Sequence, residues 1–282
     1  MLAVVSAVAS LSAWVPSVSA QSPPTSSSRT DVWDVYALEY AVLPGFPVRG
    51  LVEGADSTRR IDISMMVWLL RGDGRNVLVD AGFHSDSLVQ RWAPRDFVRP
   101  SDALARLSVA PEDVTDVVIT HLHWDHAGGV DLFPNARVWI QREELEFYTA
   151  EGRPGRAGVT VEDVALLERL RREGRLELVE GDGREILPGV TVYTGGRHTH
   201  ASQYVGVRTE AGTVVLASDN LYLYENLERR VPIAQTLDRE SNLRAQARML
   251  SLAASPRLIV PGHDPLVFSR FPEPGHGVAR IR

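Results

Sequence analysis

His121-Leu122-His123-Trp124-Asp125-His126 is the stretch of this chain that decides its fold, and it follows the apolar run Val114–Thr120 directly. The chain contains 8 histidines in 282 residues, and this hexapeptide holds three of them. Imidazole nitrogens and carboxylate oxygens together suit zinc and similar divalent ions. A β-branched run that closes in Ala127-Gly128-Gly129 indicates a buried strand that delivers ligands at its carboxyl end. In open α/β sheets, sites are built at that end of the strands.

Three further polar residues follow apolar runs in the same way. They are His198, Asp219 and His263. Glycines next to these positions permit sharp turns and a close approach of the backbone. Four separate predicted strands therefore each deliver a metal-binding side chain, and we expect these side chains to meet in one metal centre.

Composition narrows the classes of protein and of metal ligand. A hydrophobic content of 44%, a charged content of 23% and a net charge of −6 are ordinary for a globular enzyme and argue against a nucleic-acid partner. All 30 cationic residues are arginine. The chain has no cysteine, which excludes disulfides, thiolate ligands and a cysteine nucleophile. Any metal must therefore be held by histidine, aspartate or glutamate.

The N-terminus predicts export. Residues 1–20 read as a signal peptide, with an apolar run followed by the small residues Val18-Ser19-Ala20, although a basic start is missing. A buried or disordered N-terminus is the alternative. Residues 21–31 are rich in proline and serine and predict a flexible lead-in. We expect residues 32–282 to form a single domain in a periplasmic or secreted protein, with no stable membrane insertion because the apolar run is short.

Local patterns predict strands and helices that alternate in both halves of the chain. The expected strands are 32–40, 61–70, 76–79, 114–119, 138–141, 176–179, 190–194, 203–208, 213–217 and 257–260. The expected helices are 101–107, with Ser101 as its N-cap, 142–148, 161–172 and 242–254. Residues 41–60 are expected to form a loop that contains proline and glycine. Strands clustered in both halves, with helices nearby, favour two packed sheets covered by helices.

The chain resembles the metallo-β-lactamase superfamily. Its hexapeptide matches the family's His-x-His-x-Asp-His motif completely, and His198, Asp219 and His263 occur in the family's order. The resemblance extends from about Asp31 to Pro272. It implies an α+β fold, the αββα sandwich, in which two mixed sheets are flanked by helices and the metal site lies at one edge between the sheets.

The resemblance also implies two divalent metal ions, zinc in the first place, with manganese, cobalt and iron as alternatives. It implies a set of ligands and one orienting residue: His121, His123 and His198 for one ion, Asp125, His126 and His263 for the other, Asp219 as the bridge, and Asp80 as the carboxylate that orients a ligand.

One departure from the family pattern leaves an alternative open. The family often has Pro-Gly before its third histidine, whereas Gly196-Arg197 precedes His198 here. His200 is therefore a second candidate for that ligand. For Asp80, the alternative is a plain turn residue.

Asp219-Asn220-Leu221-Tyr222 is similar to the Asp-x-x-Tyr arrangement of the N-acyl homoserine lactonases, and Glu180-Gly181-Asp182 also resembles that group. The resemblance implies a quorum-quenching lactonase that acts on a small molecule. Tyr222 would help to position the lactone, and Asp125 would be both ligand and proton shuttle. Tyr222 as a packing residue is the alternative. Relatives also point to a homodimer.

Three residues are suggested for substrate binding, namely Met66, Trp68 and His84, although a methionine and a tryptophan there are more often part of a core. Other hydrolases of the fold remain alternatives: a β-lactamase, an arylesterase, an organophosphate hydrolase or a thioesterase. A metal-binding module without catalytic activity is a more distant one. The sequence leaves open the natural substrate, its acyl chain, the metal and the oligomeric state.

Overall fold

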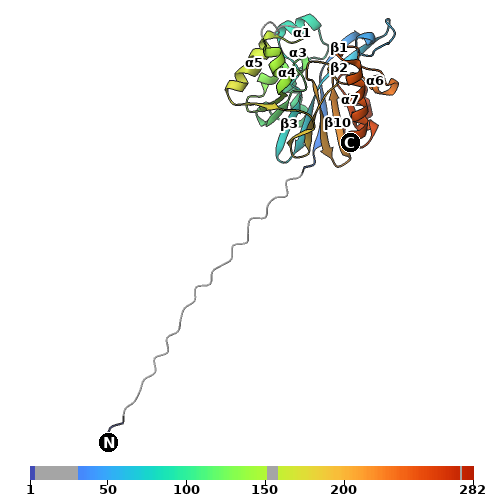
Figure 1. The fold of residues 1–282 in the computed structure, drawn as a ribbon. Coiled ribbons are helices and arrows are strands. Elements are labelled where there is room, and N and C mark those ends of the chain that lie inside the picture. Colours follow the sequence, from blue (N-terminus) through green and yellow to red (C-terminus); the bar gives the residue numbers. More distant parts are fainter. Residues whose placement is uncertain (4–30, 151–157, 274) are drawn as a thin grey trace.

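The computed structural model describes residues 1–3, 31–150, 158–273 and 275–282. In this part of the chain, two mixed sheets pack face to face, and helices cover their outer faces (Figure 1). The expected α+β class and αββα sandwich are confirmed. Residues 4–30 lie outside the description, and with them most of the expected signal peptide and lead-in, so both stay predictions.

The larger sheet joins seven strands and is antiparallel at one side and parallel at the other. In spatial order its strands are β12 (Val278–Ile281), β1 (Asp34–Pro47), β2 (Arg60–Gly72), β3 (Arg75–Val79), β4 (Asp116–Val118), β5 (Arg137–Gln141) and β6 (Leu176–Val179). Strands β2 and β3 form a hairpin through Asp73-Gly74, where both residues have positive φ.

The smaller sheet joins five strands. In spatial order they are β11 (Ile259–Pro261), β10 (Gly212–Ser218), β9 (Gln203–Thr209), β8 (Val190–Thr194) and β7 (Arg184–Leu187). The pair β10 and β11 is parallel, whereas β7 to β10 are antiparallel. Strands β8, β10 and β11 therefore end at the same edge, so the segments that follow them can meet.

Helices cover both outer faces, with α4 and α5 on one side of the sandwich and α7 on the other (Figure 1). The helices are α1 (Asp86–Trp92), α2 (Pro100–Ala103), α3 (Trp124–Ala127), α4 (Arg142–Thr149), α5 (Val161–Arg172), α6 (Tyr224–Arg229), α7 (Arg239–Leu252) and α8 (Leu266–Arg270). No helix among the described residues has the length and apolar character needed to cross a membrane.

Strand β2 shows how the sequence builds two cores at once. Successive side chains of a strand point to opposite faces, and β2 is buried on both. Met65 and Val67 join the core beneath the helices of the larger sheet. Met66 and Trp68 join the core between the two sheets. A near-continuous apolar run is therefore required here, because neither face of this strand meets water.

Several boundaries differ from expectation. Strand β1 continues to Pro47 through two register irregularities, so the expected loop 41–60 starts as strand. The helix expected at 101–107 begins at Pro100, has Arg99 and not Ser101 as its N-cap, and tightens to 3₁₀ geometry from Leu104. A proline at the first helical position explains the shift, since its fixed φ suits that position and its missing N–H costs nothing there.

Candidate metal centre

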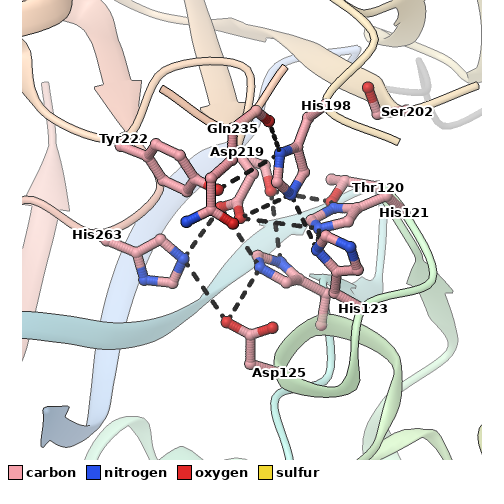
Figure 2. A network of polar contacts seen from close by, with 12 residues as sticks. Thr120, His121, His123, Asp125, His198, Ser202, Asp219, Tyr222, Gln235 and His263 are labelled. Atoms are coloured by element: carbon pink, nitrogen blue, oxygen red, sulfur yellow. Dashed lines mark hydrogen bonds and ion pairs between the residues drawn. The ribbon is translucent and has the colours of Figure 1, made fainter. Parts of the chain in front are cut away.

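Seven metal-binding side chains gather at one end of the sandwich (Figure 2). Each belongs to a segment that follows the carboxyl end of a strand: His121 and His123 after β4, Asp125 and His126 on the adjoining α3, His198 after β8, Asp219 after β10, and His263 after β11. The structure thus brings together all of the ligands that the resemblance implies, from both sheets.

His121, His123, His198 and Asp219 form one set, which we call the three-histidine group. Nε2 of His121 lies 3.1 Å from Nδ1 of His123, and Nε2 of His198 lies 2.9 Å from the same atom. Asp219 Oδ2 lies 3.3 Å from Nε2 of His198. Four candidate ligand atoms therefore surround one point, all within 4.8 Å of one another.

Asp125, His126 and His263 form the second set, which we call the mixed group. Asp125 Oδ2 lies 3.5 Å from Nε2 of His126 and 3.7 Å from Nε2 of His263. Asp219 turns its other oxygen to this group, with Oδ1 3.4 Å from His126 Nε2 and 3.0 Å from His263 Nε2. The two oxygens of Asp219 thus face different groups, which is the geometry of a bridge.

Outer hydrogen bonds fix the ring protons of these imidazoles. Nδ1 of His198 donates to the Gln235 carbonyl oxygen (2.7 Å), and Nδ1 of His263 donates to that of Ser64 (3.1 Å). In the neutral form of each ring, the lone pair is therefore on Nε2, the atom that faces its group. Metal-binding histidines are commonly oriented in this way.

Asp80 orients the remaining rings. It is fully buried, and its Oδ2 accepts from Nδ1 of His126 (2.8 Å) and from the hydroxyl of Thr120 (2.9 Å). Thr120 in turn contacts Nδ1 of His121 (3.0 Å). Asp80 adopts a positive φ of 60°, a left-handed conformation that aspartate tolerates better than most residues. It holds His126 directly and His121 through Thr120.

The protonation of the two groups differs. Burial, and then the neighbouring imidazoles, lower the pKa of His121 well below its ordinary value, and burial lowers that of His123 to about 3. Burial also lowers the pKa of His126 and His263, but the carboxylates of Asp219 and Asp125 outweigh it and raise the pKa of both rings. In return, these imidazoles hold the pKa of Asp219 well below its usual range despite its burial.

The donor set fits divalent ions. The Nε2 atoms of His121 and His198 both point at Nδ1 of His123, and a single ring nitrogen can share one proton with only one of them. Nε2 of His126 is buried without a hydrogen-bond partner. Converging lone pairs and an unpartnered nitrogen are costly unless a cation lies between them. Nitrogen and carboxylate ligands without thiolate suit zinc, manganese, iron and cobalt.

A cavity of about 230 Å³ opens over both groups. Its polar floor includes Asp125, Asp219, Tyr222 and His263, and its walls are largely apolar, formed by Leu43, Phe46, Leu51, Ile63, Met65, Trp92 and Trp124. The ring of Tyr222 lies 5.5 Å from that of His198 and 5.8 Å from that of His263, so the phenol lies beside both groups (Figure 2).

The structure does not bring the three suggested substrate residues to this cavity. Met66 and Trp68 are buried in the core between the sheets, because they lie on the opposite face of β2 from Met65, which does line the cavity. His84 forms a hydrogen bond with Asp131 (2.9 Å) in a separate surface pocket. Strand alternation would have favoured Met65 if the face of β2 had been known.

His200 lies outside both groups. Its ring stacks on Phe147, with ring centroids 3.9 Å apart, and it lines another pocket. The structure therefore places His198 and not His200 among the candidate ligands. Ser64, Thr120 and Gln235 were missed by sequence reasoning. Two of them act through backbone carbonyls, for which a sequence carries no signal.

Comparison with known proteins agrees with this geometry. The sequence profile of the Metallo-beta-lactamase superfamily matches residues 65–263, a span that includes both groups. The chain belongs to the metallo-β-lactamase superfamily. One relative, an N-acyl homoserine lactonase from Bacillus cereus, is 30% identical to this chain over 220 residues, which cover 72% of this chain and 82% of the relative. The N-acyl homoserine lactonase AiiB from Agrobacterium fabrum is 30% identical over 188 residues, covering 60% and 67%.

Solved structures of the superfamily show the same fold. An N-acyl homoserine lactone hydrolase with its product N-hexanoyl-L-homoserine at the catalytic metal centre aligns with a TM-score of 0.68 and 25% identity, covering 83% of this chain and 94% of that one. A dizinc quorum-quenching lactonase aligns with a TM-score of 0.61 at 15% identity, covering 88% and 94%. Family, fold and site together identify the chain as a metal-dependent hydrolase.

Proposed function

We propose that this enzyme hydrolyses N-acyl homoserine lactones or closely similar lactones. One observation carries the proposal: the phenol of Tyr222 shares a largely apolar cavity with residues of both metal groups. An acyl lactone has a polar ring, which suits the phenol and the metal groups, and an apolar chain, which suits the apolar walls of the cavity. The names of the relatives, N-acyl homoserine lactonases from several bacteria, support the same substrate class.

The cavity suits an acyl chain for a simple energetic reason. Leu43, Phe46, Ile63 and Met65 form one wall, and Trp92 stacks on Trp124 with 5.2 Å between their ring centroids on another. Burying apolar surface stabilises a complex by about 25 cal/mol per Å². Each methylene placed between these walls is therefore expected to strengthen binding until the cavity is filled.

The three-histidine group and the mixed group would each hold one divalent ion, and such a pair polarises an ester carbonyl and brings the pKa of a bound water near 7. Burial raises the pKa of Tyr222 well above its usual value, and the carboxylates of Asp219 and Asp125 raise it further. The phenol therefore keeps its proton at neutral pH. It can donate a hydrogen bond to the lactone oxygen on which negative charge develops.

Asp125 is suited to carry the proton. Burial raises the pKa of its carboxyl, but the imidazoles of His126 and His263 outweigh this and hold the pKa below its usual value. An ionised carboxylate at the cavity can accept the proton that the water loses as the ring carbon–oxygen bond breaks. The water oxygen bonds to the lactone carbonyl carbon as that carbon's bond to the ring oxygen breaks, and Asp125 then returns its proton to the leaving alkoxide. The products are a hydroxyl and a carboxylic acid, and the acid releases the second water proton to solvent to become a carboxylate.

Export and assembly into a homodimer belong to this proposal as well. Export is supported by the apolar run and small residues before position 20. Cell fractionation with an intact mass of the mature chain tests export, and equilibrium sedimentation tests assembly. A cytoplasmic chain that retains Met1 would contradict the first, and a monomer at micromolar concentration would contradict the second.

The substrate is tested on protein loaded separately with zinc, manganese or cobalt, with metal content measured in each sample. A series of homoserine lactones of increasing acyl length is compared with nitrocefin, an aryl ester and a phosphotriester. The lactones should give the highest kcat/KM. Fully loaded protein that turns over no lactone would refute the proposal, and a higher kcat/KM on another substrate would reassign the enzyme. Protein in which Asp219 is replaced by alanine controls for contaminating activity.

A further inference from the structure

Glu144 is a buried carboxylate that belongs to neither metal group. It lies in the first turn of α4 and is fully buried. Its Oε1 accepts the backbone N–H of Leu122 (3.1 Å), and its Oε2 accepts that of Ala201 (2.6 Å). Leu122 stands between His121 and His123, and Ala201 follows His198 by three positions. One side chain thus joins the two segments that carry the three histidines.

The two segments joined by Glu144 come from different sheets. His121 and His123 follow β4 of the larger sheet, whereas His198 follows β8 of the smaller one. Only a contact that crosses between the sheets can set the spacing between these loops. The backbone hydrogen bond from Gln203 N to the Thr120 carbonyl oxygen (2.9 Å) is one such contact. The pair of hydrogen bonds that Glu144 accepts from Leu122 and Ala201 is a second.

A second contact from the same helix reaches the same loop. Phe147 lies one turn after Glu144 on α4, and its ring stacks on His200 with an interplanar angle of 6°. Residues three apart on a helix share a face, so Glu144 and Phe147 hold Ala201 and His200 together. His200, the alternative to His198 as third ligand in the sequence, therefore packs against α4.

Burying a carboxylate is costly unless its hydrogen bonds are satisfied, and burial indeed raises the pKa of Glu144. We propose that Glu144 is a positioning residue, which holds the His198–Ala201 loop against the His121–His123 segment so that the three-histidine group can bind its metal tightly. This role concerns metal binding alone, so it stands whether or not lactones are the substrate.

The test uses Glu144→Gln, which keeps the size of the side chain. Both oxygens of Glu144 accept a backbone N–H, so an amide puts an NH₂ against a donor in either orientation. Asp116→Asn is the matched control. Asp116 is also a buried carboxylate whose two oxygens each accept one bond, from Arg75 (2.9 Å) and Trp139 (3.0 Å), but it lies at the start of β4, away from the metal groups.

Metal-free E144Q, D116N and unaltered protein are titrated with cobalt(II) against a competing chelator, and the visible absorption of the bound ion is recorded. His198→Ala and His263→Ala provide reference spectra for protein that lacks one group or the other. We expect E144Q to bind cobalt about 10-fold more weakly at the three-histidine group, the lower end for outer partners of ligands, with the mixed group unchanged. D116N should leave both groups unchanged.

Two outcomes overturn the proposal: E144Q that binds as tightly as D116N at the three-histidine group, or E144Q that loses affinity equally at both groups. If E144Q does not fold, Phe147→Leu decides the question, since it removes the stack on His200 and retains an apolar side chain. F147L should weaken the three-histidine group in the same direction. Unchanged cobalt binding by a folded F147L would then overturn the proposal.

Discussion

The three-histidine group and the mixed group lie side by side and share Asp219, yet they hold protons in opposite ways. Burial and neighbouring imidazoles lower the pKa of His121 and His123, so these rings are already free to bind metal. Carboxylates raise the pKa of His126 and His263, so these rings hold a proton up to a higher pH, and a metal has to compete with that proton. The same ligand type is thus more easily deprotonated in the three-histidine group than in the mixed group, because of the carboxylate neighbours of the mixed group.

Removal of Asp219 should have the largest effect, because each of its oxygens serves one group. We expect Asp219→Ala to weaken metal binding at both groups by more than about 100-fold, beyond the range for outer partners, and to abolish turnover. Metal content after dialysis measures this. Retention of two ions by D219A would show that the groups are independent and that the bridge is unnecessary.

Tyr222→Phe should lower kcat by up to about 100-fold, since one donor to a developing oxyanion is removed. Phenylalanine keeps the aromatic ring that contacts His198 and His263, so we expect no change in metal content at either group. Steady-state kinetics with parallel metal analysis separate the two effects. An unchanged kcat would remove Tyr222 from the mechanism, and loss of metal would make it a structural residue.

Asp80→Asn should weaken the mixed group more than the three-histidine group. Asp80 contacts His126 directly but reaches His121 only through Thr120. A loss of about 10- to 100-fold in affinity is expected at the mixed group. Cobalt titration read against single-group reference spectra measures it. Equal losses at both groups would show that Thr120 transmits the effect in full.

The smallest effect is on the pH dependence of metal uptake. Because the pKa of His126 and His263 is raised, affinity at the mixed group should increase as pH rises through those raised values, with about one proton released per imidazole. The three-histidine group should lose affinity only in acid, where His121 and His123 finally take up protons. Calorimetry in buffers of different ionisation enthalpy counts the protons. Equal proton release from both groups would show that the imidazoles of the two groups do not differ in pKa.

The stability of the metal-free protein should follow the same signs. The raised pKa of His126 and His263 adds stability that is fully present below the unfolded value and is lost as pH rises through the folded one. The lowered pKa of His121 and His123 has the opposite effect. As pH falls below the unfolded pKa, the unfolded chain takes up these protons first, and the free energy of unfolding decreases. Urea unfolding at several pH values in the presence of a chelator measures the sum of these terms.

The candidate ligands could be predicted from sequence because each follows a strand whose pattern is visible, as for Asp219 after 213–217. The bounds of helix α5 were also predicted, since Val164, Leu167 and Leu170 recur at helical spacing; in the structure, Thr160 caps the helix through the N–H of Asp163. Strands β7 and β12 were missed for local reasons: β7 begins with the exposed pair Arg184-Glu185 and has only two apolar residues, and β12 lies in a segment rich in glycine and arginine.

The substrate side could not be predicted, because it depends on which face of a strand is turned to the site. Met65 and Met66 are identical residues in adjacent positions, and only the docking of the second sheet decides which of them lines the cavity. The outer contacts from Gln235 and Ser64 are equally hidden, since any residue could supply a backbone carbonyl there. Such features arise from tertiary packing and leave no local pattern.

The order of the ligands along the chain has a consequence for biosynthesis. The first arises at His121 and the last at His263, on segments from both sheets. A growing chain on the ribosome can present the imidazoles of the hexapeptide early, but the mixed group stays incomplete until residue 263 has emerged and β11 has joined its sheet. A chain that terminates before residue 263 therefore lacks one side chain of the mixed group.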